Sequence, residues 1–207
     1  GLRLWNTQRW EPEAIPTGVP YINSLSAMAF APDSRIFAVA SQGSTNVEVW
    51  SVQSPTNVAT FTFPSGSGVG ISSLAISTNR ILAAGRRQGA VNLWDLSTRR
   101  ELMVTNLHPL TVRRLAFSLD GKVLASASFD QTVKLWNVQT LSLVSTLRGH
   151  EDEVWSVAFA PDGRSLLSGS KDGTAKLWSA SPKPQPELIP VGTNSVAFSS
   201  DSKFLIV

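Results

Sequence analysis

Apolar and polar residues alternate in short segments along the chain, and no segment of useful length has the spacing of an amphipathic helix. One segment recurs with an aromatic residue near its end. It reads LRLWN at Leu2–Asn6 and returns as VEVWS, VNLWD, VKLWN and AKLWS. The tryptophans of these segments, Trp5, Trp50, Trp94, Trp136 and Trp178, follow one another at intervals of 45, 44, 42 and 42 residues. The local pattern predicts half-buried strands, and the regular period predicts a repeat architecture.

A second recurring segment precedes four of these strands and has the pattern strand, turn, strand. Its copies span Leu25–Ser41, Ile71–Gly85, Val112–Ser128 and Val154–Ser170, and a fifth begins at Ser195. Asp-Gly pairs in two of the turns supply the positive φ angles that tight hairpins need. A further apolar run follows each of four tryptophans, at 58–63, 101–107, 141–147 and 187–190. Each unit therefore has four strands, named a to d in chain order, and the chain is predicted to be all-β.

With these segments in place, the chain resembles the WD-repeat β-propeller family over essentially its whole length. It has one Trp-Asp pair at Trp94-Asp95 and one Gly-His pair at Gly149-His150. In this family a histidine before strand a, a serine or threonine in strand b, an aspartate in the b–c turn and the strand-c tryptophan form a buried tetrad. Two units match every position, with spacings of 18, 4 and 6 residues: His108, Ser126, Asp130 and Trp136, then His150, Ser168, Asp172 and Trp178. The resemblance implies a structural role for these residues.

The resemblance implies a β-propeller of four-stranded antiparallel blades in one domain, 1–207, with about five blades' worth of sequence. Four blades are whole and one is split between the two termini. The expected units are 1–22 (strands c and d only), 23–66, 67–108, 109–150, 151–193 and 194–207 (strands a and b only). Two interpretations stay open. The sequence is a fragment of a longer WD-repeat protein, or its two partial units form one composite blade that closes the ring.

Composition excludes several kinds of chemistry. The chain has no cysteine, which removes disulfides, thiolate zinc sites and thiol nucleophiles. Its two histidines are 42 residues apart and no acidic cluster has ligand spacing, so we expect no metal and no other cofactor. The apolar runs are too short to span a bilayer, and no secretory leader precedes them. We therefore expect a cytoplasmic protein with no membrane partner and no small-molecule substrate.

His150, Ser168 and Asp172 also have the composition of a hydrolytic triad, as do the equivalent residues one unit earlier. The blade tetrad explains the same residues and their repetition at a fixed period. An enzyme rarely carries two copies of its triad in this way. We therefore expect no catalytic activity.

The resemblance also implies a docking face, formed by the d–a and b–c loops. Carried over position by position, the family's partner-contacting residues are Arg87, Thr111, Arg113, Phe129, Glu153, Trp155 and Lys171. Trp155 lies outside the tryptophan period, and packing between blades is its alternative role. Arg86, Arg87, Arg113 and Arg114 are expected near Phe129 and would suit an acidic partner, unless they only form a solvated surface.

The sequence therefore favours a non-catalytic scaffold that binds protein or peptide partners on this face. The alternative is a nucleic-acid-binding propeller that uses the arginine-rich rim. Two observations weigh against nucleic acid. The net charge is only +3, and Arg99-Arg100 is expected on the opposite face.

Overall fold

The computed structural model describes residues 4–13, 25–54, 56–63, 70–179, 186–190, 195–201 and 203–206. Every regular element within these ranges is a β-strand. The described residues include no helix long and apolar enough to cross a membrane. Their strands form four four-stranded antiparallel sheets and two two-stranded sheets. The prediction of an all-β chain with four-stranded antiparallel blades is confirmed.

Each four-stranded sheet is a meander in which strands a to d pair in chain order. The first blade contains β3 (Leu25–Phe30), β4 (Ile36–Ser41), β5 (Asn46–Ser51) and β6 (Asn57–Thr62). The second contains β7 (Ile71–Ile76), β8 (Ile81–Arg86), β9 (Ala90–Asp95) and β10 (Arg100–Asn106). The third contains β11 (Val112–Phe117), β12 (Val123–Ser128), β13 (Val133–Asn137) and β14 (Ser142–Leu147). The fourth contains β15 (Val154–Phe159), β16 (Ser165–Ser170), β17 (Thr174–Ser179) and β18 (Pro186–Pro190).

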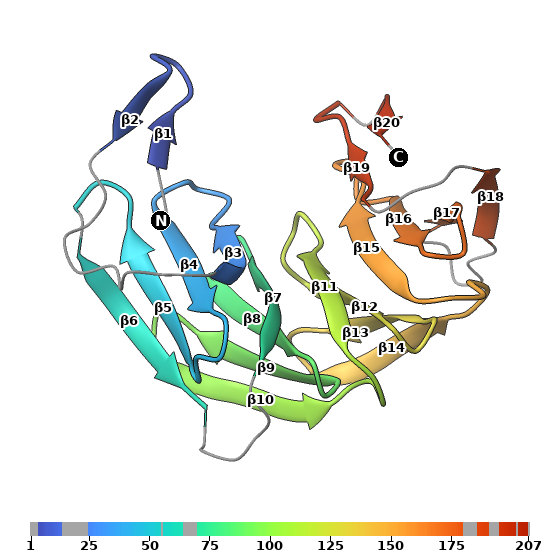
Figure 1. Ribbon diagram of the computed structural model, residues 1–207, viewed down its shortest axis with the longest axis horizontal. Coiled ribbons are helices and arrows are strands. Elements are labelled where there is room, and N and C mark those ends of the chain that lie inside the picture. The colour runs from blue at the N-terminus through green and yellow to red at the C-terminus, as the bar shows by residue number, and fades with distance from the viewer. Residues whose placement is uncertain are drawn as a thin grey trace.

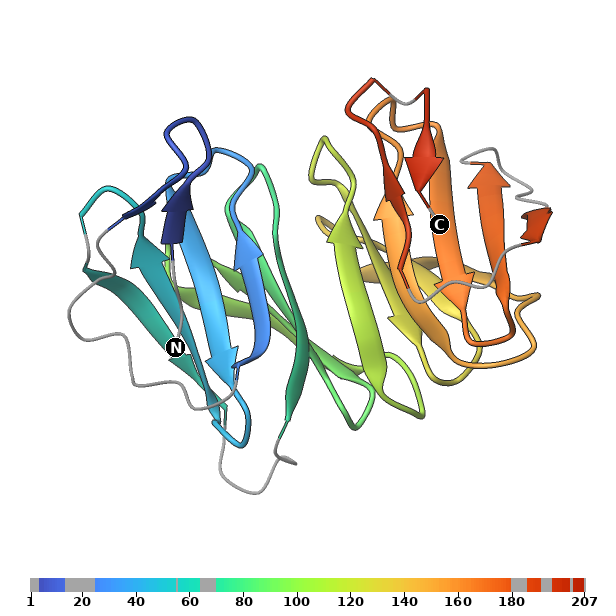
Figure 2. The same cartoon turned by 45° about the horizontal axis from the view of Figure 1, so that its top comes forward.

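The blades follow one another around an open arc, with one hairpin near each end (Figures 1 and 2). These hairpins are β1 (Leu4–Asn6) with β2 (Glu11–Glu13), and β19 (Ala197–Phe198) with β20 (Leu205–Ile206). They correspond to the two halves of the predicted split blade, but each pairs only within itself. The sheets are therefore not closed into a ring. The unit limits predicted near residues 22, 66 and 193 lie outside the described residues and stay predictions.

Most of the hydrophobic core lies between neighbouring blades, and one small cluster, with Phe37 and Trp50, lies within the first blade. The cluster between the first and second blades includes Val47 and Ile71. The cluster between the second and third includes Leu93 and Leu124, which are 1% and 0% exposed. Burying one such side chain stabilises a fold by about 1.5–3 kcal/mol. The apolar layers between blades are each shared by two blades, so the stability of a blade depends on its neighbours.

Strand b is covered on both faces in each whole blade, and its sequence is correspondingly rich in small residues. In β12, which reads VLASAS, five of six residues are buried. In β8, a Cβ added at Gly85 would lie 2.7 Å from Cγ1 of Val112 in the next blade. Small side chains here allow the blades to approach closely. They also place the strand-b serines, Ser126 and Ser168, deep inside the molecule.

The innermost strand of each whole blade contains a β-bulge at its second residue. The register between strand a and strand b shifts by one residue at this position, which is occupied by Ser26, Ser72, Arg113 and Trp155. A bulged residue has no direct partner on the neighbouring strand. The innermost strands of successive blades contact one another. These four equivalent positions therefore lie along the inner edge of the arc.

Candidate functional site

The fourth blade contains a chain of hydrogen bonds through four side chains. The Trp178 Nε1–H donates to Ser168 Oγ at 2.8 Å, and Ser168 Oγ lies 2.8 Å from Nε2 of His150. Nδ1 of His150 lies 2.8 Å from Oδ2 of Asp172. If the neutral imidazole carries its proton on Nδ1, Ser168 donates to Nε2 and every donor has an acceptor. The structure thus brings together all four residues that were predicted in this unit.

The third blade has the same arrangement for three of its four predicted residues. Nε2 of His108 lies 2.8 Å from Ser126 Oγ, and Nδ1 lies 2.7 Å from Oδ2 of Asp130. Trp136 departs from the prediction because its buried Nε1–H has no hydrogen-bond partner among the residues that the structure describes. Its ring packs instead against the apolar cluster between the second and third blades. The hydrogen-bonded network here is a triad rather than a tetrad, and Trp136 contributes packing alone.

A threonine two residues after each aspartate belongs to the network and was missed from the sequence. Oγ1 of Thr132 donates to Oδ1 of Asp130, and Oγ1 of Thr174 donates to Oδ1 of Asp172, both at 2.6 Å. The backbone N–H of each threonine donates to the same oxygen, at 3.0 and 2.9 Å. The repeated Asp-x-Thr spacing was the signal that could have revealed them. These bonds hold the b–c turn closed around the carboxylate.

The donors around each aspartate stabilise its charged form. Burial alone would raise the pKa of Asp130, but the hydrogen bonds from His108 and Thr132 outweigh it and lower the pKa to about 2. The pKa of Asp172 is also lowered, because its hydrogen-bond donors outweigh burial. Burial lowers the pKa of His150, against the opposing effect of Asp172. In the fourth blade a neutral imidazole thus faces a carboxylate at neutral pH.

The order Ser–His–Asp is that of a hydrolytic triad, but these serines are inaccessible. Ser126 and Ser168 are 0% exposed. The side chains of His108 and His150 are 0% and 1% exposed. A substrate carbonyl has no approach to either hydroxyl in this conformation. In the part of the chain that the structure describes, no group of three or more acidic or histidine residues could hold a metal ion.

The second blade has no tetrad, and an aromatic cluster takes its place. The Trp94 ring centroid lies 5.2 Å from those of Phe61 and Phe63 in the preceding blade. The guanidinium of Arg86 lies over the Phe63 ring, 4.0 Å from its centroid. Arg86 is only 6% exposed, so the expectation that it joins the other arginines on the open face is wrong. The cause is a cation–π contact between blades, which stabilises a charge at this depth.

The d–a and b–c loops were predicted to form the docking face. In three blades the same backbone hydrogen bond joins these two loops. The residue before the tetrad aspartate position donates its N–H to a carbonyl at the start of strand a. The contact joins Arg87 to Gly70, Phe129 to Thr111 and Lys171 to Glu153, at 3.0, 3.0 and 2.9 Å. It fixes each b–c turn against the d–a loop of its own blade. Side chains from both loops therefore stand next to one another on this face.

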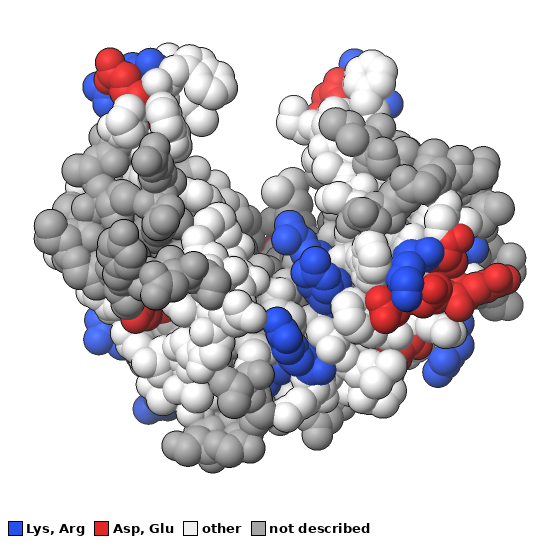
Figure 3. Space-filling model, in the orientation of Figure 1, with Lys and Arg blue, Asp and Glu red and all other residues white. Residues whose placement is uncertain are grey.

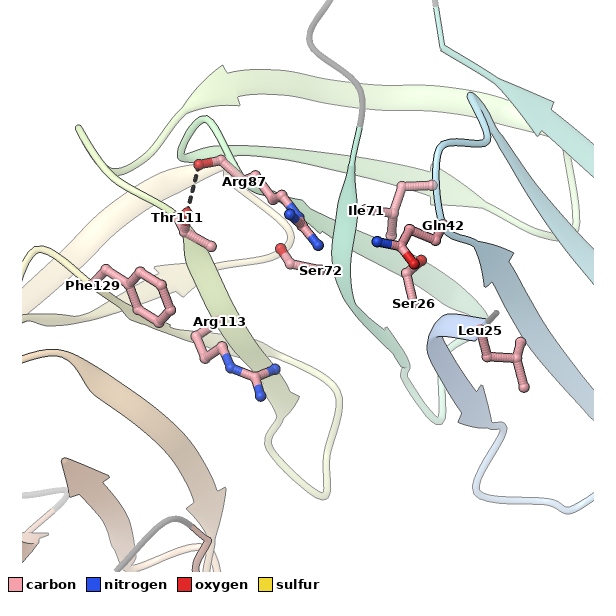
Figure 4. Close-up of a pocket in the computed structure, with 9 residues that line it drawn as sticks. All are labelled: Leu25, Ser26, Gln42, Ile71, Ser72, Arg87, Thr111, Arg113 and Phe129. Carbon is pink, nitrogen blue, oxygen red and sulfur yellow. Dashed lines mark hydrogen bonds between the residues drawn. The ribbon is translucent and has the colours of Figure 1, made fainter. Parts of the chain in front are cut away.

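Four of the seven predicted partner-contacting residues line one hollow of about 430 Å³, which we call the arginine hollow. They are Arg87, Thr111, Arg113 and Phe129. Figure 4 shows Phe129 beside Thr111 and Arg113, and Arg87 near the small side chain of Ser72. Oγ1 of Thr111 donates to the backbone carbonyl of Arg87 at 2.7 Å, which links the second and third blades. Serine at the bulge of the first two blades leaves room for the hollow.

The other three predicted residues lie on the fourth blade, outside the lining of the arginine hollow. Trp155 is half-buried, and its Nε1–H donates to Oε2 of Glu153 at 2.9 Å. Nζ of Lys171 lies 3.7 Å from Oδ2 of Asp152. Polar groups on this blade are thus partnered locally. The structure places these residues on the predicted face but does not bring them together with the hollow.

Charge is distributed unevenly over this part of the molecule. Arg87 and Arg113 are exposed, and neither makes an ion pair within the described ranges. In Figure 3 basic side chains gather over the middle of the arc, and acidic side chains gather toward the fourth blade. The arginine hollow therefore carries positive charge that the described residues do not neutralise.

Comparison with known proteins agrees with this architecture. The family model described as "WD domain, G-beta repeat" matches residues 100–137 and 141–179, which run from β10 to β13 and from β14 to β17. The chain is 33% identical over 104 residues to the Periodic tryptophan protein 2 homolog of Schizosaccharomyces pombe. That match spans 50% of the chain and 12% of the relative's length. The chain therefore contains WD repeats at residues 100–137 and 141–179.

Proposed function

We propose that the chain is a non-catalytic scaffold that binds an acidic protein or peptide segment in the arginine hollow. WD repeats generally act as protein-interaction scaffolds. The observation that carries the proposal is a pair of exposed arginines, Arg87 and Arg113, which form no ion pair with any residue that the structure describes and which line a hollow that also contains Phe129.

The chemistry of this lining suits carboxylates. A guanidinium offers two parallel N–H donors that match the two oxygens of a carboxylate. Phe129 is half-buried and offers an apolar surface beside Arg113 (Figure 4). Arginine next to an aromatic residue is typical of interaction hot spots. The volume of about 430 Å³ lies within the usual range for ligand sites.

The absence of catalysis in this proposal is supported by the buried triads. A hydrolase needs a serine hydroxyl that substrate can reach, and Ser126 and Ser168 are both 0% exposed. In the fourth blade, Ser168 Oγ also accepts a hydrogen bond from the Trp178 N–H, which engages one of its two lone pairs.

Peptide display tests the proposal. Peptides selected on the wild-type chain should be rich in aspartate and glutamate. Their affinity should fall about tenfold or more in the double variant Arg87→Glu with Arg113→Glu, which reverses both charges. Arg164→Glu is the matched control, because Arg164 is an exposed arginine in the turn between β15 and β16, at the other end of its blade. Selected peptides that bind the double variant as tightly as wild type contradict the proposal.

Nucleic acid is the alternative occupant, and the same pair of exposed arginines is the observation in its favour. Arg99 and Arg100 lie at the c–d turn, at the opposite end of the second blade from the hollow, so they cannot extend one continuous basic path. If two arginines bind a single-stranded RNA, the logarithm of the binding constant should fall with the logarithm of the salt concentration with a slope of about −1.4. RNA binding with that slope, lost in the double variant, would replace the acidic-protein proposal.

A further inference from the structure

A second concave surface lies at the opposite end of the blades from the arginine hollow. In an antiparallel meander the a–b and c–d turns share one end, and the b–c and d–a loops share the other. At the a–b and c–d end, a groove of about 390 Å³ lies between the second and third blades. Its apolar lining consists of Ile81, Leu102, Val138 and Leu141. We call it the turn-side groove.

Hydrogen bonds between the two blades hold this groove in shape. Oγ1 of Thr78 donates to the carbonyl of Leu119 at 3.2 Å, and Nδ2 of Asn79 donates to the carbonyl of Asp120 at 3.2 Å. Gly121, which lines the groove, packs so tightly that an added Cβ would lie 2.7 Å from Nδ2 of Asn79. The two walls are therefore fixed relative to each other before any ligand binds, which reduces the ordering cost of binding.

Two departures from regular backbone place leucines in the groove. Leu102 is the bulged residue of β10, where pairing with β9 shifts between Glu101 and Met103, and it is 37% exposed. Leu141 has a φ of +55°, a left-handed conformation that non-glycine residues seldom adopt. Both features recur in other units, since Arg99 has the same left-handed conformation and β14 has the same bulge, so the repeat itself fixes where these side chains lie. The groove thus offers apolar contact surface at a cost in local conformational energy.

The surroundings of the groove carry an excess of positive charge. Arg80 adjoins the lining residues in sequence, and Arg99 and Arg100 precede Leu102 in the turn and strand beside it. All three arginines are exposed, and they make no ion pair among the residues that the structure describes. Lys122, also in the lining, does lie 3.7 Å from an aspartate.

The nearby carboxylates leave this excess in place. Asp95 accepts hydrogen bonds from the N–H groups of Ser97 and Thr98, and Asp120 pairs with Lys122. A third carboxylate, Glu101, lies between Arg100 and Leu102 and accepts a hydrogen bond from Nδ2 of Asn92. Four cationic side chains and three carboxylates therefore surround the apolar groove, which leaves a positive excess. Its charge complements an acidic occupant and opposes a basic one.

We propose that the turn-side groove binds an extended acidic peptide segment with aliphatic side chains at alternate positions. Alternate residues of an extended chain point to one side, so the aliphatic side chains enter the groove between the blades. The acidic residues between them point away from the groove toward solvent, where the positive charge around the groove attracts them. This site is independent of the arginine hollow and lies on the other face of the arc, so a WD-repeat scaffold of this kind holds two acidic segments at once.

A labelled synthetic peptide that alternates leucine with glutamate is the probe. Its affinity is measured in a chain that carries Arg87→Glu and Arg113→Glu, so that the arginine hollow does not bind it. Adding Leu102→Asp should then lower the affinity about tenfold or more, because it removes an apolar contact and adds a repelling charge. Val144→Asp is the matched control, because Val144 is the bulged residue at the equivalent position of β14, is 59% exposed and does not line the groove. It should leave the affinity unchanged. A peptide with the same leucines and lysine in place of glutamate should bind at least tenfold more weakly.

Three results would overturn the proposal. One is equal loss of affinity in Leu102→Asp and Val144→Asp, and another is equal binding of the glutamate and lysine peptides. The third is self-association that Leu102→Asp abolishes, since it would identify a second copy of the chain as the occupant. Arg113→Glu separates the two sites. Loss of probe affinity in Arg113→Glu but not in Leu102→Asp would place the peptide in the arginine hollow instead.

Discussion

Replacing Asp130 with alanine should cost the third blade much of its stability. The Asp130 carboxylate accepts hydrogen bonds from His108 Nδ1 at 2.7 Å, from Thr132 Oγ1 at 2.6 Å and from the Thr132 N–H at 3.0 Å. The His108 side chain is 0% exposed, so water cannot replace the lost partner. One buried donor left without an acceptor costs about 1–3 kcal/mol.

The pKa of Asp130 gives a second measure of the same interaction. It falls from 3.8 to about 2 in the folded protein, with the opposing effect of burial already included. At about 1.36 kcal/mol per pKa unit, the ionised carboxylate gains about 2 kcal/mol on folding. The side chain is only 9% exposed, so solvent screening reduces this little. The two measures agree, and we expect Asp130→Ala to lower the free energy of unfolding by about 2–4 kcal/mol.

Because folding lowers the pKa of Asp130, the stability lost in Asp130→Ala should depend on pH. The pKa of Asp130 is lower in the folded state than in the unfolded state, so ionisation stabilises the fold above a pH of about 4. That stabilisation disappears as the pH falls from about 4 to about 2 and the carboxylate is protonated in both states. The difference between wild type and Asp130→Ala should be complete at neutral pH and shrink across this window.

Urea titrations followed by tryptophan fluorescence and circular dichroism measure both effects. Asp120→Ala is the control. Asp120 is an exposed aspartate in the turn between β11 and β12, and it bonds to Ser118 and Lys122 at the surface. Its replacement should cost less than about 1 kcal/mol. The reasoning is refuted if Asp130→Ala costs no more than Asp120→Ala, or if its cost is the same at pH 7 as near pH 2.

Three further predictions concern other parts of the fold. Gly89→Ala should destabilise the fold by more than about 3 kcal/mol, because its Cβ would lie 1.8 Å from the backbone carbonyl oxygen of His108. Gly43→Ala, with open space around it, should cost only about 1 kcal/mol, and thermal unfolding measures both changes. Arg99 has a φ of +58°, so Arg99→Gly should relieve backbone strain and raise the free energy of unfolding by up to about 1 kcal/mol, seen as a higher urea midpoint. Arg100→Gly, inside β10, should lower the midpoint. A lower midpoint in both variants would contradict the strain argument. Burial lowers the pKa of His150, so the folded protein favours the neutral imidazole. The stability that this gives is complete above a pH of about 6.5 and is lost as the pH falls through the lower pKa of the folded state. The melting temperature should therefore fall between pH 7.5 and 5 in wild type, and fall less in His150→Gln.

The strand pattern and the fourth-blade tetrad could be predicted because they depend on local rules that repeat. Alternation fixes which residues form strands, and the period fixes where each strand recurs. Identical spacings at His150, Ser168, Asp172 and Trp178 produce the hydrogen-bonded chain observed in the structure. The His–Ser and His–Asp contacts of the network depend on the backbone geometry of one unit, and the third blade repeats them at His108, Ser126 and Asp130.

Other features depend on contacts between blades, which the spacing within a unit does not encode. Arg86 follows a strand-b pattern that suggests an exposed turn, yet its guanidinium lies over Phe63 of the preceding blade. Trp136 has the correct spacing, but its indole N–H is left without a partner among the described residues. Leu102 faces the turn-side groove because a bulge removes it from the alternation. In each case packing with a neighbouring element, or a local break in register, decides the outcome.

The bulge in strand a has a practical consequence for altering what the scaffold binds. The bulged residue takes no part in the regular pairing of strand a with strand b. Three residue types already occupy this position in the four blades: serine at Ser26 and Ser72, arginine at Arg113 and tryptophan at Trp155. The four positions differ in size and charge while the flanking ladders keep the same register. A combinatorial library randomised at these four positions should therefore retain the fold in most members and yield binders of new specificity.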